Sequence, residues 1–193
     1  NIAIGYEAMD STTTNNHTGT IAIGHQALTA LTSGVANTAI GYQALLASSD
    51  GSYNTVVGYQ AGIAIGEGTR NTVVGTWALY EEDYGASNTA IGYAAMLSQN
   101  TSGTSQVTSA NTGVGQAAGY YNVTGINNTY LGFQAGRGGV GSNSNNTAVG
   151  KDALLSITTG SSNISIGGAS GDALLNGGDN VFVGFAAGSA TTA

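Results

Sequence analysis

The chain has 193 residues, among them 32 glycines and no cysteine or proline, and its formal net charge is −7. Because only three residues are Lys or Arg, it cannot neutralise a run of phosphates, which argues against nucleic acid and against an anionic membrane surface as partners. The lack of cysteine excludes disulfides and thiolate metal sites, and no apolar run reaches the roughly 18 residues of a membrane-spanning helix.

A repeat begins at the first residue and continues to the end of the chain. Its fullest form is Asn-Thr-Ala-Ile-Gly-Tyr-Gln-Ala-Leu at residues 37–45. The dominant spacing between successive copies is 17 residues, and such a fixed period is the signature of a repeat architecture. We call the glycine that follows the aliphatic residue the anchor glycine. In chain order the anchors are Gly5, Gly24, Gly41, Gly58, Gly75, Gly92, Gly115, Gly132, Gly150, Gly167 and Gly184.

Each unit predicts one coil of a parallel β-solenoid. Seventeen residues are too few for two packed helices, whereas a short alternating stretch such as residues 37–40 is typical of a strand. We expect a second, less regular strand near residues 45–48. The predicted fold class is therefore all-β, with about eleven coils in a single repeat domain over residues 1–193. Because residue 1 already lies inside a repeat, we expect the chain to be a segment of a longer protein.

Two columns of the alignment predict structural roles. Glycine is expected to supply a positive φ or a close backbone approach at the corner after each strand, as at Gly41, Gly58, Gly75 and Gly92. Asn precedes the anchor by four residues in ten of the eleven copies, and its amide can bond to the next coil or cap a turn. The predicted ladder includes Asn37, Asn54, Asn71, Asn88, Asn111, Asn128 and Asn146.

The apolar columns predict which side chains face the core. We expect the aliphatic residue directly before the anchor, such as Ile40, to point into the coil. Alternation then places the residue before it outside, as Ala39 and Val56. A stripe of such residues along the rod would be a large exposed patch. We therefore expect it, together with the aromatic residues that follow the anchor, to pack against identical chains.

The segments 37–41 and 88–92, both Asn-Thr-Ala-Ile-Gly, resemble the head repeats of trimeric autotransporter adhesins, and similar glycine-rich repeats occur in phage tail fibres. The resemblance covers essentially the whole chain. It implies a left-handed parallel β-roll in a parallel homotrimer. The unit of 17 residues departs from the shorter adhesin repeat, and its Tyr-Gln-Ala continuation at 42–44 is more similar to the phage-fibre variant.

Candidate sites for recognition lie in two polar insertions, because insertions in solenoids form loops on one face. Their uncharged residues suit hydrogen bonding to cell-surface glycans, although tolerated loops without a ligand are an equal alternative. The candidates are Asn16, His17, Asn100, Thr101, Ser102, Thr104 and Gln106, with Asn16 and Asn100 as possible glycosylation sites.

No catalytic residues, metal ligands or cofactor are expected, and we predict that the chain is not an enzyme. Neither His17 nor His25 has a partner at ligand spacing, and His25 takes the place of Tyr in the aromatic column. The acidic run 81–83 lies beside Trp77 and Tyr80, and we interpret it as a solvated turn, although a cation site there remains an alternative.

Three functions remain open. The first is a structural segment of an extracellular fibre with an adhesion or receptor-binding role, either in a phage tail fibre on the virion or in an adhesin on a bacterial surface. The second is a self-assembling extracellular filament or matrix protein. The third is ice binding through a Thr column three residues before the anchor glycine, in which Ile or Val replaces Thr in four copies. The expected inward direction of that column disfavours the third function.

Overall fold

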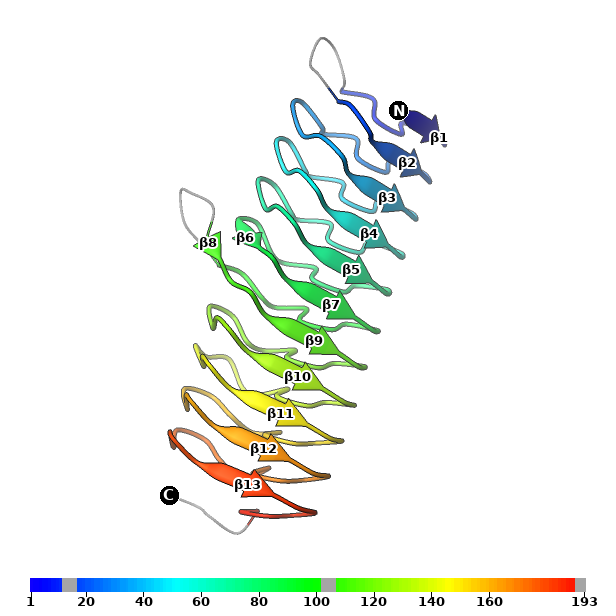
Figure 1. Ribbon diagram of the computed structural model, residues 1–193. Coiled ribbons are helices and arrows are strands. Elements are labelled where there is room, and N and C mark those ends of the chain that lie inside the picture. Colours follow the sequence, from blue (N-terminus) through cyan, green and yellow to red (C-terminus); the bar gives the residue numbers. More distant parts are fainter. Residues whose placement is uncertain (12–16, 102–106, 190–193) are drawn as a thin grey trace.

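The computed structural model describes residues 1–11, 17–101 and 107–189, and they form a rod of stacked coils (Figure 1). The predicted all-β parallel solenoid with a repeat of about 17 residues is confirmed. Its strands are short: β1 (Ile2–Ile4), β2 (Ile21–Ile23), β3 (Thr38–Ile40), β4 (Thr55–Val57), β5 (Thr72–Val74), β6 (Gly85–Ala86), β7 (Thr89–Ile91), β8 (Val107–Thr108), β9 (Thr112–Val114), β10 (Thr129–Leu131), β11 (Thr147–Val149), β12 (Ile164–Ile166) and β13 (Val181–Val183).

Eleven of these strands form one parallel sheet along the rod, in the order β1-β2-β3-β4-β5-β7-β9-β10-β11-β12-β13. The register pairs equivalent repeat positions, so Thr38 lies beside Thr55 and Ile40 beside Val57. A second parallel sheet pairs β6 with β8. Every column of the sequence alignment therefore becomes a physical column on the rod.

The return path of each coil is a turn segment, and the expected second strand near residues 45–48 does not form. The backbone φ angle alternates in sign along this segment, and it is positive at Gln43 and Leu45, both at 53°. The coils nevertheless bond to each other on this side, since Gln43 N–H donates to the His25 carbonyl at 2.9 Å and Leu45 N–H to the Ala61 carbonyl at 3.2 Å. These bonds satisfy the backbone without a ladder of strands.

The predicted inward and outward faces of the strands are reversed. The residue directly before the anchor points outward, as at Ile40, which is 36% exposed. The middle residue of the strand points inward, so Ala39 and Val56 are fully buried. The turn segment explains the reversal, because its Leu28 and Leu45 also fill the core and leave room for only a small side chain opposite them.

The exceptions to this pattern show how the core is filled. Where the middle strand residue is large, as at Tyr130, glycine occupies the neighbouring core positions of the turn segment. A Cβ added to Gly136 would lie 2.2 Å from the Tyr130 ring, and one added to Gly119 would lie 2.7 Å from it. Phe182 stands in the same relation to Gly171 and Gly188. Large side chains therefore alternate between the two walls of the core, as close packing requires.

The corner glycines adopt backbone angles that other residues rarely reach. Gly41, Gly58, Gly75 and Gly92 have φ between 130° and 144°. A Cβ at Gly75 would also approach the carbonyl oxygen of Gly92 in the next coil to 2.5 Å. Glycine is thus required at this corner both by its torsion angle and by the stacking of the coils.

The Asn column joins successive coils through the backbone. The N–H of Asn54 donates to Asn37 Oδ1 at 3.0 Å, and Asn54 Nδ2 donates to the carbonyl of Gly68 at 2.9 Å. The same pair of bonds recurs at Asn71. These side chains are buried, so each amide satisfies polar groups that water cannot reach.

Candidate functional site

The outward side of the eleven-stranded sheet is the most extensive candidate site, and we call it the strand face. It consists of the first and third residues of each strand. The third residue is aliphatic in every strand, and the column comprises Ile4, Ile23, Ile40, Val57, Val74, Ile91, Val114, Leu131, Val149, Ile166 and Val183. All of these side chains are exposed or half-buried. An apolar column of this length is unusual for a monomer.

Threonine accompanies the aliphatic column in the central coils. Thr38, Thr55, Thr72, Thr89, Thr112, Thr129 and Thr147 open seven successive strands of the sheet. They are also exposed or half-buried, and they align in register with one another. Neither column contains a charged residue. The strand face therefore presents a regular, uncharged array of hydroxyl, methyl and branched aliphatic groups.

Aromatic residues continue the apolar surface beyond the corner glycine. Tyr6, His25, Tyr42 and Tyr59 follow the anchors of the first four coils, and their rings stack with centroids 5.1–5.2 Å apart. Further along the rod the same column contains Tyr93, Phe133 and Phe185, all of them exposed. We call this set the aromatic column. The apolar surface thus extends over both sides of the corner.

A ladder of glutamine side chains runs next to the aromatic column. Gln60 Nε2 donates to Gln43 Oε1 at 2.8 Å, and Gln43 Nε2 donates to Gln26 Oε1 at 2.8 Å. The ladder begins at Glu7, where the hydrogen bond from Gln26 lowers the pKa of the carboxyl group. It ends at Trp77, whose indole N–H donates to Gln60 Oε1 at 3.0 Å.

Three of the loop residues predicted to recognise a ligand are described by the structure, and these three do not form an open surface. Asn16, Ser102, Thr104 and Gln106 lie outside the described residues. His17 is buried, with 7% of its surface exposed, and Thr101 is buried at 5%. Asn100 is half-buried, and its N–H donates to the carbonyl of Val123 at 2.7 Å. The expectation that His17 and Thr101 face a ligand is therefore wrong.

Thr101 is buried because it bonds to a carboxylate of the acidic run. Its hydroxyl donates to Glu82 Oε1 at 2.7 Å, and the N–H of Gly85 donates to the same oxygen at 2.8 Å. Glu82 is fully buried, so the interpretation of residues 81–83 as a solvated turn is wrong for this residue. The carboxylate ties the loop before the second insertion to the coil below it. Its neighbour Glu81 remains exposed.

Within residues 1–11, 17–101 and 107–189, no group of three or more His, Cys, Asp or Glu side chains could hold a metal ion. The same residues include no helix long and apolar enough to cross a membrane. The side chains that the structure does organise are the strand face, the aromatic column and the glutamine ladder.

Comparison with known proteins gives no relative from which a function could be transferred. No family model, no curated protein and no solved structure matches the chain. Functional inference therefore rests on the surfaces of the rod.

Proposed function

We propose that the chain is a structural segment of an extracellular fibre and that it assembles with identical chains through the strand face. The observation that carries the proposal is the uncharged Thr and aliphatic array along the whole sheet. Ten steps between strands about 4.8 Å apart make this array roughly 50 Å long. Leaving it in water would forgo a large hydrophobic free energy, on the order of 25 cal/mol per Å².

A second copy of the chain is the partner that fits this surface best. The seven central strands of the sheet begin with Thr, and all eleven end with an aliphatic residue, so two parallel copies in register match coil by coil along the rod. Closed symmetric assemblies are the usual outcome of such self-complementarity. The face also lacks charges that would orient a different, charged partner.

The aromatic column favours three copies over two. The apolar surface lies on both sides of the corner glycine, and one flat partner would cover only the strand face. With three parallel chains around an axis, each chain contacts two neighbours and can cover both sides of its corner. Such a trimer also agrees with the resemblance to adhesin heads and phage tail fibres, and adhesion to a cell surface is the role that the resemblance suggests.

The test is to place charge in the middle of the strand face. The double variant Val74→Lys/Ile91→Lys should dissociate the assembly into monomers, because each buried ammonium group would lack a partner. Sedimentation velocity gives the oligomeric state, and circular dichroism checks that the solenoid is retained. Ala47→Lys is the matched control, since Ala47 is exposed on the turn side and its replacement should leave the assembly intact.

An unchanged oligomer in the double variant would contradict assembly through the strand face. Loss of the oligomer in Ala47→Lys alone would contradict it as well, because the turn side would then carry the contact.

Ice binding is a second candidate, and the outward direction of the Thr column favours it. The repeat pattern predicted an inward Thr column, which disfavours ice binding, but these Thr side chains are exposed or half-buried on the strand face. Seven aligned Thr residues beside aliphatic residues on a regular sheet could order water at the spacing of the strands. The two functions use the same face, so a chain whose strand face is covered by its neighbours cannot present it to ice.

Thermal hysteresis distinguishes these functions. The fibre proposal predicts an oligomer that does not depress the freezing point beyond its colligative effect. A monomer with thermal hysteresis that is lost in Thr72→Tyr, while Ala47→Tyr retains it, would establish ice binding in place of the fibre.

A further inference from the structure

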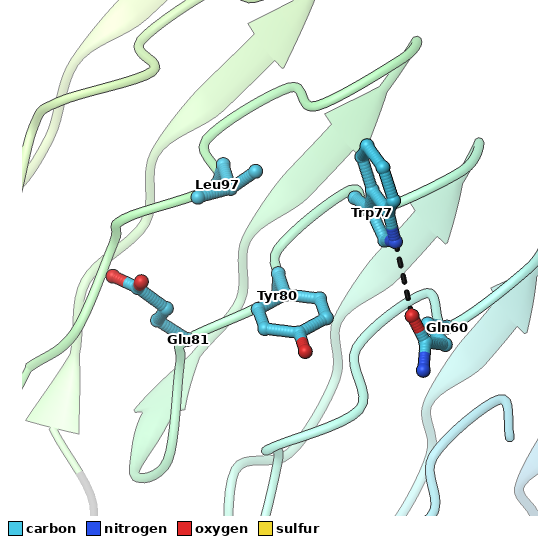
Figure 2. Close-up of a pocket in the computed structure, with 5 residues that line it drawn as sticks. All are labelled: Gln60, Trp77, Tyr80, Glu81 and Leu97. Carbon is cyan, nitrogen blue, oxygen red and sulfur yellow. Dashed lines mark hydrogen bonds between the residues drawn. The ribbon is translucent and has the colours of Figure 1, made fainter.

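A pocket of about 190 Å³ interrupts the regular surface of the turn side in the middle of the rod. It is lined by Gln60, Trp77, Tyr80, Glu81 and Leu97. Figure 2 shows these side chains around one space, with Tyr80 between Trp77 and Glu81. The three preceding coils carry glutamine (Gln26, Gln43 and Gln60) where this coil has Trp77, and Trp77 is the only tryptophan of the chain. The pocket is thus a local departure from the repeat.

The rings of the pocket are held in place by neighbouring coils. The indole N–H of Trp77 donates to Gln60 Oε1 at 3.0 Å, and Gln60 Nε2 is engaged by Gln43 Oε1 at 2.8 Å. The Trp77 ring also lies 5.5 Å from the Tyr93 ring, at an interplanar angle of 56°. Fixed rings reduce the entropy lost when a ligand binds.

The groups that remain available to a ligand are mainly acceptors and π-faces. Among the described residues, neither the Glu81 carboxylate nor the Tyr80 hydroxyl has a hydrogen-bond partner. The polar atoms of Gln60 and the indole N–H are already paired with each other or with the ladder. A neutral sugar needs donors as well as acceptors around its hydroxyl groups, and this pocket offers few donors.

The electrostatic character of the pocket is negative. Aromatic rings present negative faces, and Glu81 adds a full charge at the rim. The Glu81 charge also acts beyond the pocket. The pKa of the Tyr120 phenol is raised by burial, and the nearby Glu81 carboxylate raises it further. No Lys or Arg lines the pocket. A cation with apolar substituents combines the charge and the contact surface that these side chains would stabilise.

We propose that this pocket binds a quaternary ammonium group, such as the trimethylammonium head of choline, with its methyl groups against Trp77, Tyr80 and Leu97 and its charge beside Glu81. Cation–π contact with Trp is the strongest of its kind and needs no hydrogen bond from the ligand. The pocket lies on the turn side and is lined by no residue of the strand face or of the aromatic column. Its test measures choline binding directly and does not require the fibre proposal to hold.

The lone tryptophan makes the site directly observable. Titration with choline chloride, at an ionic strength held constant with sodium chloride, should change the Trp77 fluorescence saturably in the millimolar range. The neutral isostere 3,3-dimethyl-1-butanol should bind at least roughly fivefold more weakly, because it keeps the shape and loses the charge. Methyl glucopyranoside should give no saturable change.

Two variants assign the effect to the pocket. Glu81→Gln keeps the shape and should weaken choline binding roughly fivefold, as expected for an exposed charge pair. Asp179→Asn removes an exposed carboxylate far along the rod and should leave the affinity unchanged. Trp77→Gln restores the residue of Gln43 and Gln60 in the same column, so the coil should fold. In a saturation-transfer NMR experiment, the Trp77→Gln variant should reduce the transfer from the protein to the choline methyl protons by a factor of roughly five to thirty.

Equal affinity for choline and its neutral isostere would overturn the proposal in favour of a merely apolar pocket. Saturable binding of the glucoside without binding of choline would overturn it in favour of a sugar site. If the folded Trp77→Gln variant gave the same saturation transfer to the choline methyl protons as the unchanged protein, choline would bind outside this pocket and the proposal would be overturned.

Discussion

At the scale of single residues, the corner glycines and the Asn side chains determine whether a coil can stack on the next. The sequence predicted both columns, because a required backbone angle and a required amide each leave a fixed residue type at a fixed spacing. It did not predict that the Asn amides bond mainly to backbone groups of the next coil, since the position of the Gly68 and Gly85 carbonyls depends on the path of the turn segment.

Gly75→Ala should lower the stability of the rod by more than about 3 kcal/mol, because strain at a positive φ adds to the collision with a backbone carbonyl. A Cβ at this position would lie 2.5 Å from Gly92 O, whereas one at Gly184 would meet nothing within 4 Å. Gly184→Ala, with φ +125°, therefore measures the strain alone and should cost clearly less. Thermal unfolding of the two variants tests this difference, and equal losses would show that the coil contact contributes nothing.

Asn71→Ala should cost about 2–4 kcal/mol, because it leaves the buried Asn88 N–H and Gly85 carbonyl without their partners. Both bonds are 2.9 Å long. Asn180→Ala in the last described coil should cost less, since no following Asn N–H depends on that side chain. Chemical denaturation measures both free energies of unfolding. A loss at Asn71 below that at Asn180 would argue against the ladder as a stabilising element.

At the scale of the coil, the strand and the turn segment share one core. Parity alone could not decide which strand face is inward, because both faces are apolar. The turn segment decides it by contributing its own leucines. A usable signal was present in the sequence: glycine replaces leucine in the turn segment next to Tyr130 and Phe182, as expected if the middle strand residue points toward that segment. The second strand was mispredicted because a segment whose residues alternate between left- and right-handed backbone conformations has no distinctive amino-acid composition.

Tyr130 and Gly136 should therefore behave as a coupled pair. Tyr130→Ala alone leaves a cavity and should lower the free energy of unfolding by about 3–5 kcal/mol. Gly136→Leu alone should prevent the coil from folding, because the new side chain collides with the Tyr130 ring. The double variant reproduces the Ala and Leu combination of other coils, such as Ala39 and Leu45, and should recover part of the loss. Additive losses in a double-mutant cycle would contradict the shared core. The positive φ of Gly136, 55°, is also that of Leu45 within two degrees.

At the scale of the whole molecule, the strand face is the surface on which the proposed self-assembly depends. The sequence predicted a long outward apolar stripe but assigned it to the wrong column. The Thr and aliphatic columns form that stripe, and the aromatic column extends it past the corner. The pocket at Trp77 was not predicted as a site, because its lining residues come from three coils and only the solenoid path brings them together.

The molecular mass in solution tests the central claim most directly. One chain has a mass of 19.0 kDa, and sedimentation equilibrium at micromolar concentration should give three times that value. The result should persist at high salt, because burial of apolar surface is not screened by ions. A mass of a single chain at the same concentration would contradict assembly through the strand face.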